Sequence, residues 1–283
     1  MEADPVVSLP VQLLTLEGRS CRLDHAVPDA VAVEAPLEIR VDGRSIAVIM
    51  RSPGRDRELA AGFLLSEGVI ASPQDLFEVS VCPAAAPGGG VVDVLVTKPE
   101  EIDFDRLTRH VFTASSCGVC GKTSMDSALA VHPPLAPPTG PWCDAAVLFQ
   151  LPELQRAAQT SFVRTGGQHA AALFSRTGEL RALEEDVGRH NAVDKITGAA
   201  LLSGNWPLDD AILLLSGRAS FELIQKALAA RIPMVCSIGA PSSLAVSLAA
   251  SAGITLCGFL RSHRANVYTH PERLGLTAIA VAD

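Results

Sequence analysis

Two cysteines three residues apart, Cys117 and Cys120, lie in the stretch "SSCGVCGK". Such a pair fits metal ligation, a redox disulfide, inert packing or the carriage of sulfur. The neighbouring residues are small and polar, whereas a packed structural cysteine usually has apolar neighbours. Lys122 favours the thiolate, which is the nucleophilic form, and the adjacent glycines let a large reactant approach the backbone. The composition of the stretch therefore favours a reactive loop over inert packing.

The metal and disulfide alternatives have less support from spacing. A structural zinc site needs four ligands, usually from two close pairs, and the chain has neither a second Cys-x-x-Cys nor a His-x-x-x-His. Zinc would have to recruit distant residues such as Cys143 or His132. A thioredoxin-like motif would begin a helix early in a βαβ unit, whereas this motif lies late in a β-rich half. We expect no metal and predict a loop that handles sulfur.

Three polar corners follow expected strands in the second half: "EEDVGRHNAVDK" (184–195), "SGRAS" (216–220) and "GAPSS" (239–243). If these strands run parallel, the corners meet at the sheet edge where open α/β sheets bind ligands. Helix N-termini there would offer N–H groups to an anion. The alternative is ordinary helix capping with solvated ion pairs.

A fourth polar stretch, "GFLRSHRANVYTH", follows the last long expected strand. Arg261, His263 and Arg264 form a short basic cluster beside the aromatic residues Phe259 and Tyr268. Arginine suits phosphate and an aromatic ring suits base stacking, so the stretch is typical of nucleotide binding. A solvated strand end is the alternative.

The order of elements predicts two domains. The first half is β-rich: Asp42-Gly43 predicts a hairpin within residues 37–50, one helix should end at Gly68, and two strands flank "PAAAPGGG". The proline-rich segment 132–141 marks the boundary. Strands then alternate with helices, which predicts a layered α/β domain whose order is cytidine-deaminase-like. We therefore expect a β-rich domain over residues 1–140 and a deaminase-like α/β domain over residues 141–283.

Deamination itself is disfavoured on chemical grounds. That class places a general acid/base glutamate two residues after a zinc-ligating histidine, and a Pro-Cys-x-x-Cys further along the chain. Here "HAAA" begins at His169 with alanine in place of the glutamate, and the later "SGRAS" has no cysteine.

Composition narrows the class of protein further. The chain has 283 residues, 48% of them hydrophobic and 19% charged, with a net charge of −8, so a duplex-binding protein is disfavoured. Seven scattered cysteines and an acidic, proline-broken start argue against a secreted disulfide framework and a secretion signal. The uncharged segment 233–260 is interrupted by Pro241 and glycines, which indicates strand, helix and strand rather than a membrane span. We expect a cytoplasmic protein with no membrane or nucleic-acid partner.

Five stretches together resemble the formate dehydrogenase accessory sulfurtransferases, over roughly residues 35–274: "SSCGVCGK", "DVGRHNAVDK", "SGRASFELIQKA", "GAPSSLAV" and "GFLRSHRANVYTHPERL". The resemblance implies a homodimer that takes sulfur from a cysteine desulfurase. It implies delivery of this sulfur to bis(molybdopterin guanine dinucleotide), the molybdenum or tungsten cofactor that formate dehydrogenase needs in sulfurated form. Cys117 would carry the persulfide, and Cys120 would support the transfer or accept the sulfur in turn.

The same resemblance implies a cofactor-binding stretch, with GDP as a mimic of the cofactor. It falls on Phe259, Leu260, Arg261, Ser262, His263 and Arg264. Two other functions stay open: a non-catalytic cofactor-binding chaperone of formate dehydrogenase, and a zinc hydrolase of the deaminase type.

Overall fold

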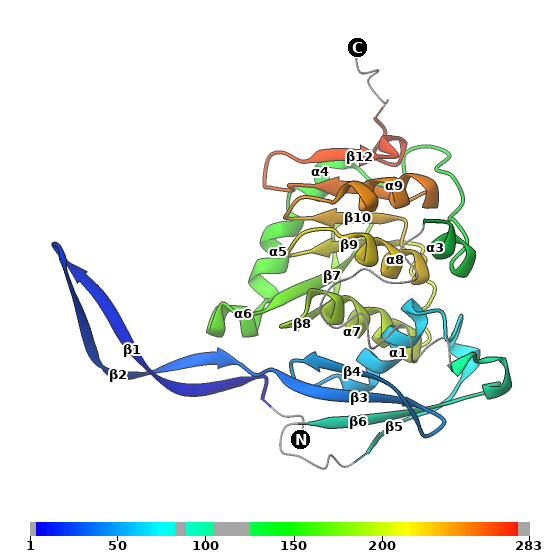
Figure 1. Ribbon diagram of the computed structural model, residues 1–283. Coiled ribbons are helices and arrows are strands. Elements are labelled where there is room, and N and C mark those ends of the chain that lie inside the picture. Colours follow the sequence, from blue (N-terminus) through cyan, green and yellow to red (C-terminus); the bar gives the residue numbers. More distant parts are fainter. Residues whose placement is uncertain (1–3, 83–88, 105–124, 277–283) are drawn as a thin grey trace.

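The computed structural model describes residues 4–82, 89–104 and 125–276. Two sheets lie one above the other with helices between them, and a long two-stranded arm projects from the body (Figure 1). The mixed α/β class expected from the sequence is confirmed. Among the described residues no helix is both long enough and apolar enough to cross a membrane.

The larger sheet has six described strands in the order β12-β11-β10-β9-β7-β8. They are β7 (His169–Ser175), β8 (Leu180–Asp186), β9 (Ala211–Leu215), β10 (Met234–Ser237), β11 (Thr255–Gly258) and β12 (Asn266–Thr269). β10 pairs parallel with β9 and β11, whereas β7 pairs antiparallel with β8 and β9. Hence β8, β9, β10 and β11 run in one direction and their carboxyl ends share one edge, as predicted for the polar corners.

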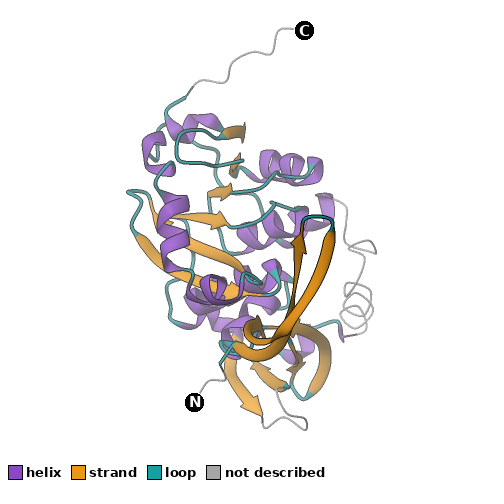
Figure 2. Cartoon of the chain, turned by 90° about the vertical axis from the view of Figure 1, so that its left-hand side faces the viewer, coloured by secondary structure: helices purple, strands orange, loops and turns teal. Residues whose placement is uncertain are grey.

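Helices cover both faces of this sheet, because the central strands are apolar on both sides. All residues of β9, β10 and β11 are buried. One face packs against α7 (Arg189–Leu202), α8 (Phe221–Ala229) and α9 (Ser243–Ala252). The other face packs against α4 (Ala145–Leu148) and α5 (Leu151–Ala158), and α6 (Thr160–Thr165) follows. Figure 2 shows the two helical layers with the strands between them.

The smaller sheet has the order β4-β3-β6-β5 among the described residues. Its strands are β3 (Ala35–Val41), β4 (Arg44–Arg51), β5 (Leu76–Cys82) and β6 (Gly90–Val96). Asp42 and Gly43 have φ values of 48° and 75°, the left-handed pair that a two-residue hairpin turn needs, so the predicted hairpin is confirmed. The predicted helix is α1 (Asp56–Ser66), which buries Leu59, Leu64 and Leu65 against the sheet.

The remaining described elements are short. They are α3 (Met125–Val131) and the 3₁₀ turns η1 (Pro73–Asp75), η2 (Pro99–Glu101) and η3 (Pro271–Leu274). Each of the 3₁₀ turns has a proline in its first turn, where the missing N–H has no helical partner to lose.

The two sheets are joined where α1 crosses α7. A Cβ on Gly62 would meet the carbonyl oxygen of Asp194, and a Cβ on Gly198 would meet that of Glu58, so glycine is required for this approach. Asp194 also accepts from Lys226 Nζ at 2.8 Å and from Ser66 Oγ at 2.8 Å. Because core contacts cross the junction, the division into two domains at residue 140 stays a proposal.

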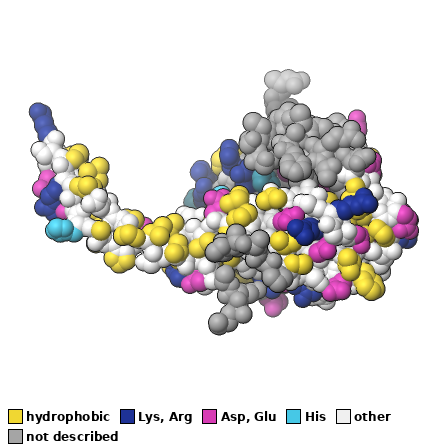
Figure 3. All heavy atoms as spheres, turned by 60° about the horizontal axis from the view of Figure 1, so that its bottom comes forward, with side chains coloured by type: hydrophobic (Ala, Val, Ile, Leu, Met, Phe, Trp, Pro, Cys, Tyr) yellow, Lys and Arg dark blue, Asp and Glu magenta, His cyan; other side chains and the backbone are white. Residues whose placement is uncertain are grey.

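The arm is a hairpin of β1 (Val6–Glu17) and β2 (Ser20–Ala32), which the sequence analysis did not predict. Apolar residues face each other across it, such as Val11 opposite Val27 and Leu14 opposite Leu23. Leu14 and Leu16 are 68% and 72% exposed. Figure 3 shows hydrophobic side chains along much of the visible surface of the arm.

Candidate functional site

Cys117 and Cys120 lie outside the described residues, so their role as sulfur carriers stays a prediction. Three of the described cysteines, Cys143, Cys236 and Cys257, are buried. Burial, with Asp144 nearby, raises the pKa of Cys143 to about 11. A hydrogen bond with Cys257 and complete burial raise the pKa of Cys236. The raised pKa keeps Cys143 and Cys236 protonated at neutral pH, and burial shields all three thiols from a protein partner, so they are unsuitable as nucleophiles.

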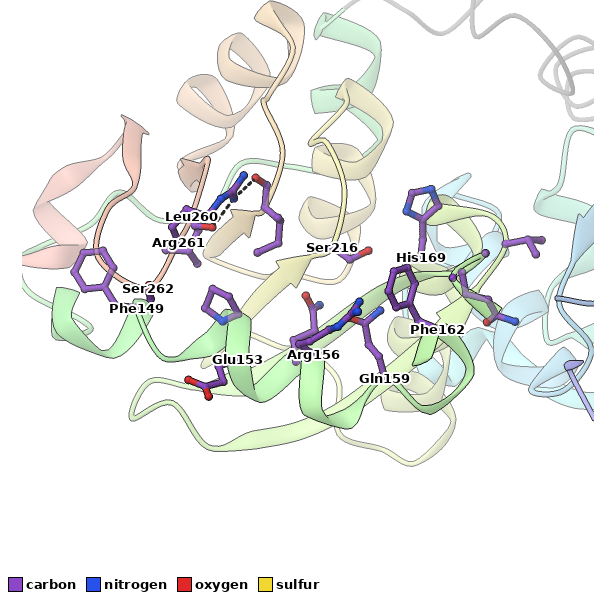
Figure 4. A pocket seen from close by; sticks show the side chains of 17 residues that line it. Phe149, Glu153, Arg156, Gln159, Phe162, His169, Ser216, Leu260, Arg261 and Ser262 are labelled. Carbon is purple, nitrogen blue, oxygen red and sulfur yellow. Dashed lines mark hydrogen bonds between the residues drawn. The ribbon is translucent and has the colours of Figure 1, made fainter. Parts of the chain in front are cut away.

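A cavity of about 720 Å³ opens at the carboxyl edge of the larger sheet. Its lining comes from the start of β7, the ends of β9, β10 and β11, and helices α5 and α6. Figure 4 shows Arg261, Ser216 and His169 spread along the strand ends, with Arg156 and Phe162 on the helical wall. This is the edge at which open α/β sheets bind ligands.

The helical wall carries aromatic and cationic groups. The Arg156 guanidinium lies 4.2 Å from the centre of the Phe162 ring, which stabilises both side chains by a cation–π contact. Phe149 extends the apolar surface toward the other end of the cavity (Figure 4). Gln155 lines the wall as well and donates to the Leu214 carbonyl at 3.0 Å, which fixes α5 to the sheet. The wall therefore offers aromatic surface beside a positive charge.

Of the six residues expected to bind the cofactor, Leu260, Arg261 and Ser262 line the cavity. Leu260 is fully buried and packs in the core. Arg261 Nη1 donates to the carbonyls of Ile238 at 2.7 Å and Leu260 at 2.8 Å, so part of its guanidinium holds the loop. His263 and Arg264 are exposed and are not part of the lining.

Phe259 has a φ of 52° and its side chain is 39% exposed. The left-handed region costs a bulky residue about 1 kcal/mol, and such strain is concentrated at functional sites. Phe259 N donates to the Gly239 carbonyl at 3.0 Å, which ties this corner to the end of β10. The strain supports a ligand-binding role for the corner but does not assign one to the ring.

The loops after β9 and β10 run unusually close together. A Cβ on Gly239 would lie 2.9 Å from the Gly217 carbonyl oxygen and 3.0 Å from Arg218 Cα. Gly239 N also donates to that carbonyl at 2.9 Å. Only glycine permits this spacing, which holds the loops that lead into α8 and α9 against each other at the carboxyl edge of the sheet.

His190 follows the first residue of α7 and lies near Ser220 and Glu222. Burial, then the positive charges of Lys226 and Arg189, lower the pKa of His190 to about 4. The ring is therefore neutral at pH 7 and hydrogen-bonds weakly to Ser220 Oγ at 3.4 Å. A carboxylate next to the neighbouring turn, Asp186, is fully buried and paired with Lys195 Nζ at 2.7 Å. The neutral imidazole and the Asp186–Lys195 ion pair therefore hold this corner in a fixed geometry.

Sequence reasoning missed Phe149, Arg156, Phe162 and His169 as cavity residues. The first three lie at or within short helices that precede the sheet, and their sequence shows only an amphipathic pattern. The only available signal was that two aromatic residues and an arginine occur together in residues 149–162. Hydrophobic periodicity predicts helices there, but it does not predict which edge of the sheet these helices cover.

Comparison with known proteins agrees with this architecture. The family model described as "FdhD/NarQ family" matches residues 32–275. The "Sulfur carrier protein FdhD" of Streptomyces coelicolor is 49% identical over 256 residues, covering 89% of this chain and 91% of the relative. The protein of the same name from Mycobacterium tuberculosis is 49% identical over 258 residues, covering 87% of this chain and 92% of the relative.

A solved structure is similar over nearly the whole chain. It is the crystal structure of a putative formate dehydrogenase accessory protein from Desulfotalea psychrophila. It is 26% identical with a TM-score of 0.72, and the match covers 94% of this chain and 99% of that one. Because the family model and the curated relatives match most of its length, the chain belongs to the FdhD/NarQ family.

Proposed function

We propose that this protein is a sulfur carrier for a formate dehydrogenase. The names of its relatives, sulfur carrier proteins and a formate dehydrogenase accessory protein, support this role. In its finer form, the proposal is a sulfurtransferase that receives sulfur from a cysteine desulfurase and passes it to bis(molybdopterin guanine dinucleotide). We place this chemistry in the cytoplasm and assign it to a homodimer.

The structural observation that carries the proposal is the cavity at the carboxyl edge of the larger sheet. Its volume, about 720 Å³, lies within the range of about 300–1,000 Å³ typical of small-molecule sites. Phe149 and Phe162 offer aromatic surface for a base, and Arg156 and the Ser216 hydroxyl offer polar groups. This donor set fits a guanine nucleotide, the terminal portion of the cofactor, which is bound here as a substrate.

The sulfur step is a thiol–persulfide exchange. The Cys117 thiolate attacks the terminal sulfur of the desulfurase persulfide, the S–S bond of that persulfide breaks, and the desulfurase cysteine leaves as a thiolate. No net oxidation occurs, because one persulfide replaces another. Cys120 supports the onward transfer or accepts the sulfur in turn.

Intact mass spectrometry tests the carrier role. Wild type, Cys117→Ala and Cys120→Ala are incubated with a cysteine desulfurase and cysteine. We expect a gain of one sulfur that is lost in Cys117→Ala. Cys21→Ala serves as the matched control, since Cys21 is exposed near the tip of the arm and outside the proposed site, and it should keep the gain.

A non-catalytic cofactor chaperone is the alternative function, and GDP binding separates the two. A carrier that loses Cys117 still binds GDP but acquires no sulfur. A chaperone binds GDP and acquires no sulfur even as wild type, and that result would overturn the carrier proposal.

A further inference from the structure

The tip of the arm is apolar on one face and polar on the other. Directly opposed residues share a face of an antiparallel ribbon, and so do residues two apart on one strand. Leu14 and Leu16 of β1 therefore share a face with Leu23 of β2, and all three side chains are more than half exposed. On the other face, Arg22 pairs with Asp24 at 2.7 Å, so the charged groups of the tip are already partnered.

Nearer the body, a second apolar set shares one face of the ribbon: Val7, Leu9, Val11 and Val27. The pairing shifts between Gln12 and Leu14, where β2 has one residue more than β1. Side chains of β1 alternate without interruption, so Val11 and Leu14 point to opposite faces. The apolar residues therefore change faces at the shift.

The twist of the ribbon brings the two sets back to one side of the arm. Two-stranded ribbons twist more strongly than larger sheets, and β1 and β2 exchange places along the arm in Figure 1. When the strands have exchanged places, the opposite face of the ribbon points in the original direction. Figure 3 agrees, because hydrophobic side chains continue along the visible side of the arm. The two sets therefore form one apolar strip that runs along the arm.

This apolar strip needs a surface to cover it. The base of the arm is fixed, since α6 contacts β2 and Val33 N donates to the Pro5 carbonyl at 2.8 Å. Beyond its base, the arm projects away from the body (Figure 1). A two-stranded hairpin on its own is only marginally stable in water, and a monomer rarely exposes an apolar patch of more than roughly 600 Å². The arm therefore has the properties of an interface.

The area of the strip favours a second copy of this chain as its occupant. One side of a ribbon about 40 Å long and about 10 Å wide covers about 400 Å². Against an unrelated partner, this contact would remove about 800 Å² of surface from both proteins together, which is the size of a weak contact. In a two-fold dimer the contact occurs twice, and the resulting total of about 1,600 Å² is the standard size of a stable interface.

The charge of the arm favours the same occupant. The chain has a net charge of −8, so two copies repel each other over most of their surfaces. The arm is nearly neutral, with two arginines and three acidic residues within residues 6–32. Two acidic copies can therefore meet through their arms at little electrostatic cost. Because the arm has no excess of basic residues, it is poorly suited to an anionic membrane surface.

We propose that the arm clasps a second copy of this chain in a reciprocal two-fold dimer. The proposal rests on the homodimer of the proposed function, and it names the surface that forms this homodimer. Each copy covers the strip of its partner and has its own strip covered in return. Such an interface is closed and leaves neither strip exposed.

Sedimentation equilibrium of the full chain tests the clasp. Leu14→Glu should weaken dimerisation by at least about a hundredfold, because it places an unpaired carboxylate in the interface at two equivalent positions. Leu23→Glu, directly opposite, should have the same effect. Ser20→Glu is the matched control, since Ser20 lies opposite Glu17 on the polar face of the tip and its variant should stay dimeric. Circular dichroism checks that each variant keeps the fold.

The outcomes separate the clasp from the proposed function. A wild-type dimer that both leucine variants leave intact would overturn the clasp, and the proposed function would stand. A monomeric wild type would overturn both the clasp and the homodimer, whereas the sulfur gain of Cys117 tests the carrier role separately. If this monomer floats with vesicles of phosphatidylcholine and phosphatidylglycerol, the strip binds lipid and the clasp is wrong. If it binds formate dehydrogenase and Leu14→Glu abolishes this binding, the strip serves the enzyme and the clasp is also wrong.

Discussion

The crossing of α1 and α7 makes a specific prediction for Gly198→Ala. An added Cβ would meet the Glu58 carbonyl oxygen and would lie 2.7 Å from the Gly62 nitrogen and 2.8 Å from the Glu58 carbonyl carbon. All three atoms belong to the backbone of α1. No side chain can rotate away, so the methyl group fits only if the two helices move apart.

The expected change in stability is the difference between two effects. Alanine favours a helix over glycine by about 1 kcal/mol. Overpacking a close backbone contact costs about 1–3 kcal/mol, and the upper end applies here because the obstacle is rigid. We therefore expect Gly198→Ala to lower the free energy of unfolding by about 2 kcal/mol.

Urea denaturation followed by circular dichroism measures this change. Gly167→Ala is the matched control: a Cβ there would lie 3.5 Å from the Ala32 Cβ, an ordinary contact, so stability should stay within about 0.5 kcal/mol of wild type. A second test is Gly62→Ala combined with Gly198→Ala, whose joint cost should be less than the sum, since the first methyl already separates the helices. Wild-type stability in Gly198→Ala would refute the reasoning.

Three further predictions follow from the buried and exposed groups. Lys226→Met should lower the free energy of unfolding by about 3–5 kcal/mol, because Asp194, whose side chain is 2% exposed, loses its cation. Urea denaturation measures this change. The double variant Lys226→Met/Asp194→Asn should recover part of the loss, and a double variant as unstable as Lys226→Met alone would contradict the explanation. The pKa of His190 is lowered to about 4 in the folded protein, so as the pH falls the unfolded state takes up this proton before the folded state does. The neutral ring therefore contributes fully to the free energy of unfolding above pH 6.5, and this contribution is lost as the pH falls toward 4. About a third of the His190 side chain is exposed, so we expect the free energy of unfolding of wild type to fall by only about 1–2 kcal/mol between pH 7 and pH 4.5. His190→Gln should remove this part of the pH dependence. If wild type and His190→Gln lose the same stability over this range, His190 is not the cause. Finally, maleimide labelling at pH 7.5, read by peptide mass spectrometry, should modify exposed Cys21 in the native protein and Cys143 only after unfolding, because burial raises the pKa of Cys143 to about 11; labelling of native Cys143 would show that the fold opens there.

Local signals in the sequence predicted much of the fold. Asp42-Gly43 specifies its turn because both residues must adopt left-handed φ values. The apolar run of β9 is buried on both faces, so its length and composition suffice to identify a central strand. The shared edge of the polar corners followed from the parallel direction of these strands.

Other features depend on contacts that a sequence pattern does not contain. Pro10 and Pro28 lie opposite each other in the arm, and prolines normally indicate that a strand is absent. A ribbon of two strands tolerates them because each strand has an unpaired side. The cavity wall escaped prediction for a different reason: Arg156 and Phe162 belong to short helices whose position over the sheet is set by tertiary packing.

The arm also determines how the protein behaves as a particle in solution. A compact chain of 283 residues has a radius of gyration of about 19 Å. The twelve residues of β1 extend about 40 Å, at roughly 3.3 Å per residue, so they add greatly to the longest dimension and little to the volume. The scattering of a free monomer should therefore show a long, thin tail of interatomic distances, and its sedimentation should be slow for its mass. If this tail of long interatomic distances disappears when the protein associates, the arm is packed within the assembly.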